Sequence, residues 1–262
     1  MTLTDLLRLA VQRDGARPFI TYYDDATGER TELSVTTFHN WVAKTSNYLG
    51  DELGLGSGSA VGVSLPLHWL TAVWLSACWA VGAVPVINPT DDEVLDAAVI
   101  GPRRVDHDHG LLPMANDVVA VSLAPLAASF GRLGTELPDG VRDYTDEVRL
   151  HGDHFVPAAW PSPDDPALCV RDLTWTHNEL VHNVTALAAR FGIGERARLL
   201  TTQDLDGVDP LDAILAAFVT PLVVDGSVVM CVNADPSGLS ARADAEHVTA
   251  RAQPPRSPAP EA

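Results

Sequence analysis

The feature that most constrains the fold is a run of 23 residues, Leu65 to Ile87, that contains no Lys, Arg, Asp or Glu. Pro66 can begin a helix there, and Gly82 with Pro85 can end one, which leaves about fifteen helical residues or about 22 Å. A membrane span needs about 30 Å of apolar helix, so this one is too short to cross a bilayer. We expect no membrane span, and instead a helix buried on all sides.

Strands are expected on both sides of that helix, at 60–65 and 83–87, and a strand–helix–strand unit predicts a parallel pair with a right-handed crossover. Alternating elements continue along the chain and predict an α/β fold of layered, mostly parallel sheets. The other helices are expected over 4–13, 34–53 with Ser34 as N-cap, 91–100 with Thr90 as N-cap, 178–191 and 211–218, and the other strands over 18–23, 29–33, 117–123, 167–170, 197–202 and 222–232.

Three regions follow from this alternation and from composition. We expect an N-terminal α/β region at 1–163, whose 101–163 stretch has one clear strand and otherwise open structure. A second α/β block of the same domain is expected at 164–239. Residues 240–262 are rich in proline and poor in apolar side chains, which predicts a disordered tail.

Charge excludes some partners. The formal net charge is −18, from 17 Lys and Arg against 35 Asp and Glu, which disfavours nucleic acid. The chain's one lysine, Lys44, lies away from the apolar stripe of Phe38, Val42 and Leu49, and no glycine-rich loop precedes it. We therefore interpret Lys44 as a solvated helix residue without a role in phosphate chemistry.

The cysteines indicate a compartment. Cys78, Cys169 and Cys231 stand in apolar contexts without metal-ligand spacing, which favours buried free thiols in a reducing cytosol. The N-terminal residues lack the pattern of a secretion signal. A cytoplasmic location is expected.

Asp106-His107-Asp108-His109-Gly110 is the most metal-like cluster. On a strand, His107 and His109 would share a face, and imidazole with carboxylate binds divalent ions. No third ligand of clear spacing accompanies them, although His151 and His154 follow later, so an acidic loop with solvated histidines is the preferred interpretation. We predict no metal site, with His107 and His109 as the candidates if one exists.

Motifs of catalysis are missing from the sequence. The glycines at 56–62 follow a predicted helix and precede a strand, the reverse of a dinucleotide-binding turn. Ser64 and Ser227 lie in predicted strands without G-x-S-x-G, and there is no Walker loop. No catalytic residue and no cofactor are therefore assigned. Thr176 to Glu179 forms a capping box before an apolar helical pattern.

Several segments together resemble a known family. They are Pro18-Phe19-Ile20, Thr31-Glu32-Leu33, Val61-Gly62-Val63-Ser64-Leu65-Pro66, and the stretch from Trp79 to Pro89, which includes Gly82. Their order resembles the N-terminal part of the adenylate-forming superfamily, which includes acyl-CoA synthetases, amino-acid-adenylating domains and luciferases. A second block, from Asp164 to Val170 and on from Thr176-His177-Asn178-Glu179-Leu180, resembles the strand and helix that flank the family's phosphate-binding loop.

The resemblance also implies losses. The family's TSGTTGxPKG-like loop is absent between Val170 and Thr176, and no residue matches the family's adenine-binding or Y-x-T-G-D motifs or its catalytic lysine. We expect a degenerate, non-catalytic AMP-binding-like protein, similar to compact actinobacterial proteins of unknown function. It would keep a remnant pocket for acyl-CoA or AMP, or serve as a regulatory or assembly partner of another chain or of itself. The alternatives are an adenylating enzyme completed by a second chain, or metal-dependent activity at Asp106 to His109.

Overall fold

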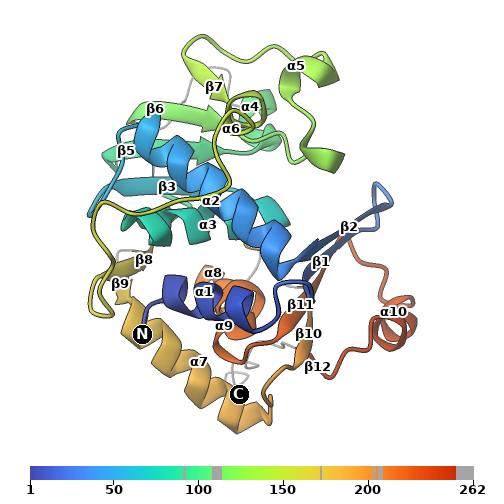
Figure 1. Ribbon diagram of the computed structural model, residues 1–262. Helices are drawn as coiled ribbons and strands as arrows, with labels where there is room; N and C mark the ends of the chain where they lie inside the picture. The colour runs from blue at the N-terminus through green and yellow to red at the C-terminus, as the bar shows by residue number, and fades with distance from the viewer. Residues whose placement is uncertain (91–92, 108–113, 172, 203–204, 206–208, 252–262) are drawn as a thin grey trace, which may run out of the picture.

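Two mostly parallel sheets organise the molecule, as Figure 1 shows. The computed structural model describes residues 1–90, 93–107, 114–171, 173–202, 205 and 209–251. The seven-stranded sheet has the order β7-β6-β5-β3-β4-β8-β9, and the five-stranded sheet has the order β12-β10-β11-β1-β2. The strands are β1 Pro18–Asp24, β2 Glu29–Ser34, β3 Ala60–Ser64, β4 Val84–Ile87, β5 Leu95–Ile100, β6 Ala115–Ala120, β7 Val141–Asp143, β8 Pro166–Val170, β9 Leu173–Thr176, β10 Arg198–Thr201, β11 Ser227–Val232 and β12 Ala250–Arg251.

Helices cover the sheets and fill the space between them (Figure 1). α2 and α3 pack against each other, and α1 contacts both of them as well as α9, so one apolar core runs through both halves. The helices are α1 Leu3–Asp14, α2 Val35–Asp51, α3 Trp69–Val81, α4 Pro102–His107, α5 Phe130–Leu133, α6 Tyr144–Val148, α7 His177–Phe191, α8 Pro210–Ile214, α9 Thr220–Val223 and α10 Leu239–Ala245, with short turns η1 Pro125–Ala127 and η2 Leu215–Val219. The predicted α/β class is confirmed.

The expected regions 1–163 and 164–239 interleave in both sheets. β8 lies parallel beside β4, and β11 lies parallel beside β1, so each sheet takes strands from both regions. In addition, the Trp79 indole on α3 donates a hydrogen bond to the Ala167 carbonyl oxygen on β8, at 2.6 Å. Neither region has a sheet of its own.

α3 is the helix that the uncharged run predicted. All thirteen of its residues are buried, and it lies between the parallel neighbours β3 and β4 in the chain. It begins after His68 rather than at Pro66, because the His68 side chain accepts a hydrogen bond from the Leu70 amide and caps the helix. It ends at Gly82, whose φ of 81° is left-handed. No helix within the described ranges is long and apolar enough to span a membrane.

The expected helix at 91–100 is wrong, because Leu95–Ile100 forms β5. Thr90 and Glu93 do form the capping contacts, with the Glu93 carboxylate accepting from the Thr90 amide at 2.7 Å. The chain then turns into a strand that pairs in parallel with both β3 and β6. Pairing on both sides and burial of four consecutive residues, Ala97 to Ile100, outweigh the local helix signal.

The stretch from 101 to 163 is more ordered than the sequence indicated. β6 confirms the predicted strand, and β7 extends the same sheet beyond it. The prediction of a disordered tail from Ser240 is wrong for its first part, because α10 and β12 occupy 239–251 and β12 pairs with β10. The rest of that expected tail, 252–262, lies outside the described residues.

Candidate functional site

A tight hairpin stands where the resemblance places a phosphate-binding loop. β8 ends at Val170 and β9 begins at Leu173, and these two residues are antiparallel partners, so only positions 171 and 172 connect them. Arg171 takes a left-handed φ of 49°, which a non-glycine residue adopts at a cost. A connection of two residues has no room for the ring of backbone N–H groups that cradles phosphates. The predicted absence of that loop is confirmed.

A crevice of about 470 Å³ opens at the carboxyl ends of strands from both sheets. Its walls include the ends of β1, β3 and β11, and the residues that follow β4 and β5. β4 and β5 lie on opposite sides of β3, so the chain changes direction across the sheet at this place. Open α/β sheets bind ligands at such points, outside the carboxyl ends of the strands. The crevice is therefore the best-placed candidate site.

Polar side chains from four separate segments line the crevice. Arg103 and Arg104 follow β5, and the Arg104 guanidinium donates to Ser64 Oγ at 3.2 Å. Across the crevice, the Asn233 amide nitrogen donates to Asp24 Oδ1 at 2.7 Å. Asp24 is the one carboxylate among the described lining residues, against two arginines. Arginine side chains bind phosphate and carboxylate groups through paired N–H donors, so the two arginines make the crevice a candidate site for an anionic ligand.

His68 adds a neutral donor to the same crevice. Its Nδ1 accepts from the Leu70 amide at 3.1 Å, which places the imidazole proton on Nε2. Burial lowers the pKa of His68 to about 3, despite the opposing charge of Asp24, so the ring stays neutral at ordinary pH. Nε2 is buried and has no hydrogen-bond partner. Together with the N-terminus of α3, it marks a place suited to an acceptor atom.

The two residues predicted as metal candidates lie outside the part of the chain whose side chains are described. His107 ends α4 but its side chain is not described, and His109 lies outside the described residues. His151 packs against the Tyr48 ring with centroids 5.7 Å apart, and His154 lines a different cavity. Among the described residues, no group of three or more His, Cys, Asp or Glu side chains is placed to hold a metal ion.

The interpretation of Lys44 as a solvated residue is wrong. Lys44 is half-buried, and its Nζ donates to the carbonyl oxygen of His151 at 2.6 Å. One turn later on α2, the Asn47 amide nitrogen donates to the carbonyl oxygens of Gly152 and His154, at 2.9 and 3.0 Å. Lys44 therefore holds the segment that follows α6 against α2. It has no part in a phosphate-binding loop.

The thiols largely match their prediction. Cys78 and Cys231 are buried and free, and Cys169 is free but half-buried on β8. Burial raises the pKa of the Cys78 thiol to about 12, so it does not ionise near neutral pH. Sequence reasoning missed the crevice residues Arg103, Arg104 and His68. Their signal is positional, since His68 comes shortly after the predicted strand 60–65, and Arg103 and Arg104 come shortly after the predicted element 91–100, whose end forms β5.

Comparison with known proteins gives one relative by sequence. No family model matches the chain. A TIGR03089 family protein from Mycobacterium tuberculosis is 39% identical over 243 residues, which cover 91% of this chain and 93% of the relative.

Solved structures share the fold. The N-terminal domain of FACL13 from Mycobacterium tuberculosis superposes with a TM-score of 0.72 at 14% identity, over 96% of this chain and 62% of that one. An acyl-CoA synthetase from Brucella canis gives a TM-score of 0.76 at 14% identity, over 96% and 47%, and a fatty acyl-CoA synthetase of Mycobacterium tuberculosis gives 0.69 at 15%, over 95% and 48%. The chain spans about half to three-fifths of these structures, and the likeness shows a common fold, as the resemblance predicted. By its sequence relative, the chain belongs to the TIGR03089 family.

Proposed function

We propose that this protein is a non-catalytic ligand-binding protein, which holds AMP or the nucleotide part of an acyl-CoA in the crevice at the carboxyl ends of the strands. The observation that carries the proposal is the two-residue connection between β8 and β9. Adenylate formation requires that the transferring phosphates be held and their developing charge neutralised. A hairpin in place of the loop leaves the fold without the groups that do this, while a cationic crevice remains beside it.

The charges of the crevice support a phosphate or carboxylate as the bound group. Arg103 and Arg104 line one wall, and arginine binds such groups through paired N–H donors. The neutral Nε2–H of His68, which also lines the crevice, supplies a further donor. The chain's one lysine contributes nothing there, because Lys44 is bonded to the His151 carbonyl. These groups can bind an anion, and we propose that they do so without catalysing a reaction. The free thiols support a cytoplasmic location for the protein.

Catalysis is tested directly. Purified protein is incubated with ATP, magnesium and a panel of carboxylic acids, and AMP and pyrophosphate are measured. We expect no release above a blank without protein. Robust AMP release by this chain alone would refute the non-catalytic part of the proposal.

Binding is tested by thermal shift and calorimetry with AMP and with acyl-CoA. A ligand that binds the folded state raises the melting temperature as its concentration passes the dissociation constant. Arg104→Gln should weaken binding by about tenfold, because a charge-assisted hydrogen bond is lost. Arg132→Gln, an exposed arginine on α5 outside the crevice, is the matched control and should bind normally. A flat response of the unmodified protein to both ligands would remove the binding part.

A further inference from the structure

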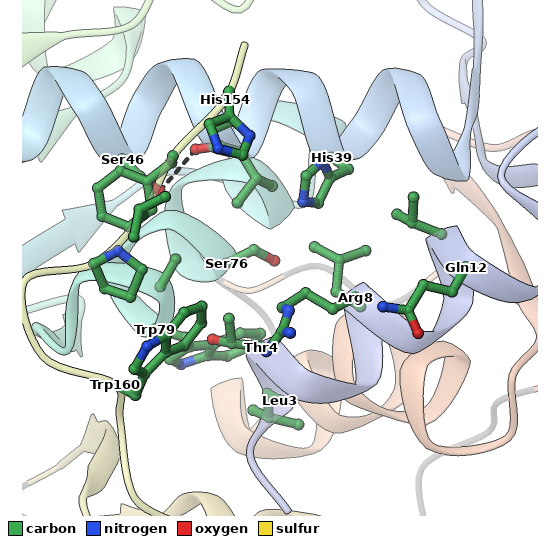
Figure 2. Close-up of a pocket in the computed structure, with 18 residues that line it drawn as sticks. Leu3, Thr4, Arg8, Gln12, His39, Ser46, Ser76, Trp79, His154 and Trp160 are labelled. Carbon is green, nitrogen blue, oxygen red and sulfur yellow. Dashed lines mark hydrogen bonds between the residues drawn. The ribbon is translucent and has the colours of Figure 1, made fainter. Parts of the chain in front are cut away.

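A second cavity, of about 330 Å³, lies between α1, α2, α3 and the segment 154–160 (Figure 2). It shares no described lining residue with the crevice, so it is a separate site. Its volume is that of about eleven water molecules at about 30 Å³ each. This falls at the small end of the range for pockets that bind organic ligands.

The inner wall of the cavity is apolar. Leu7 from α1, Val42 from α2 and Trp79 from α3 face it, and all three side chains are buried. Thr4 also lines the cavity, and its hydroxyl oxygen is buried without a hydrogen-bond partner. An apolar chain placed here would remove hydrophobic surface from water, at about 25 cal/mol for each Å².

One arginine and two histidines stand at the opening of the cavity. Figure 2 shows Arg8 from α1 and His39 from α2 on two sides of the cavity, with His154 of the facing segment near His39. The Arg8 guanidinium lies 4.8 Å from the centre of the ring of Trp160, which also lines the cavity. Asp5 is the acidic partner of Arg8, at 3.5 Å and exposed. Burial lowers the pKa of His39, and the charges of His154 and Arg8 lower it further, so His39 stays neutral at ordinary pH and the positive charge at the opening is that of Arg8.

The wall that completes the cavity is held in place. The hydrogen bonds from Lys44 and Asn47 fix the backbone at 151–154, which includes the lining residue His154 and leads directly into the lining residue Phe155. The cavity therefore exists before any ligand arrives, which lowers the entropy lost on binding.

We propose that this cavity binds a small amphipathic carboxylate, with its apolar chain against Leu7, Val42 and Trp79 and its carboxylate between Arg8 and His39. An apolar wall with a few convergent donors at one end matches such a molecule. The cavity takes a body of about ten non-hydrogen atoms at this volume. Octanoate has that size and serves as the probe. The ligand would sit apart from the crevice, so both sites can be occupied together.

Calorimetry with octanoate tests the proposal, and octanol is the uncharged comparison. We expect one octanoate to bind per chain, and octanol to bind at least about tenfold more weakly because it lacks the charge. Arg8→Gln should weaken octanoate binding by about tenfold or more. Arg8 is exposed on its helix, so this change is expected to leave the fold intact.

Arg190→Gln is the matched control, because Arg190 is also exposed on a helix and also lies over an aromatic ring, Phe191, at 5.5 Å. It should bind octanoate as the unmodified protein does. Absence of octanoate binding in the millimolar range, equal binding of octanol, or equal losses in both arginine variants would each overturn the proposal. The AMP affinity of Arg8→Gln should equal that of the unmodified protein, because AMP is proposed to bind in the crevice and not in this cavity.

Discussion

Removing the Lys44 ammonium is expected to loosen the wall of the second cavity. Lys44→Met keeps the aliphatic stem of the side chain and removes the donor to the His151 carbonyl at 2.6 Å. A hydrogen bond from a charged group contributes about 1.5–3 kcal/mol, and half-burial of Lys44 places this one at the lower end, about 1.5 kcal/mol. In a chain of this length, 1 kcal/mol lowers the melting temperature by about 2–4 °C. We expect a loss of about 3–6 °C.

The loss of stability in Lys44→Met should be confined to one part of the chain. Hydrogen exchange should accelerate in 151–160, since Lys44 and Asn47 hold its start, while α3 and β3 stay protected as parts of the buried core. Lys44→Arg restores a cationic donor and is the control for charge. Octanoate affinity is the third readout, and it should fall in Lys44→Met although Lys44 does not line the cavity. Unfolding and exchange identical to those of the unmodified protein would refute this reasoning.

Three further predictions concern stability. Asp225→Asn should cost about 3 kcal/mol in urea denaturation, because Arg17, 14% exposed and 2.7 Å from the carboxylate, would keep a charge without its counter-ion. Burial alone would raise the pKa of Glu246, but hydrogen bonds from its neighbours, Arg198 among them, hold that pKa at about 2. The resulting stabilisation is present above the unfolded pKa of about 4.3 and is lost as the pH falls toward 2. The variant Glu246→Gln should therefore show a flatter dependence of unfolding free energy on pH between these two values. Burial lowers the pKa of His177 to about 4, so stability should fall as pH drops from about 6.5 to 4, and His177→Asn should remove that slope in pH-dependent denaturation.

Helix ends are predicted correctly from the sequence where the two residues that form the cap lie within a few positions of each other. The Thr176 and Glu179 capping box forms as predicted, and Gly192 ends the same helix in a left-handed conformation. Ser34 caps α2 in the same way. The signal at Thr90 and Glu93 is equally local, yet a strand follows it, because β3 and β6 offer hydrogen bonds on both sides. The pairing of a segment with strands far away in the sequence cannot be predicted from its local sequence pattern.

Both cavities depend on contacts between segments that lie far apart in the sequence, which is why the residues that line them could not be predicted. The crevice joins Asp24, Ser64, Arg104 and Asn233, which meet because β1 and β11 pair in one sheet and β3 and β5 pair in the other. None of these residues belongs to a short motif. Similarly, Lys44 was assigned to solvent because helical periodicity describes its own helix and not the segment that covers it.

The fold and the crevice do not depend on the length of the connection after β8. β8 pairs in parallel with β4, through Val86 and Ile87, and the Trp79 indole bonds its Ala167 carbonyl, so the strand is anchored along its length and not by the connection that follows it. Loops at strand ends tolerate deletion when the strands are held in this way. No described residue of β8 or β9 lines the crevice, which is formed by the ends of β1, β3 and β11 and by the residues that follow β4 and β5. Loss of the loop and retention of a ligand site are thus physically independent, and a longer β8–β9 connection inserted into this protein should change neither the crevice nor its affinity for AMP.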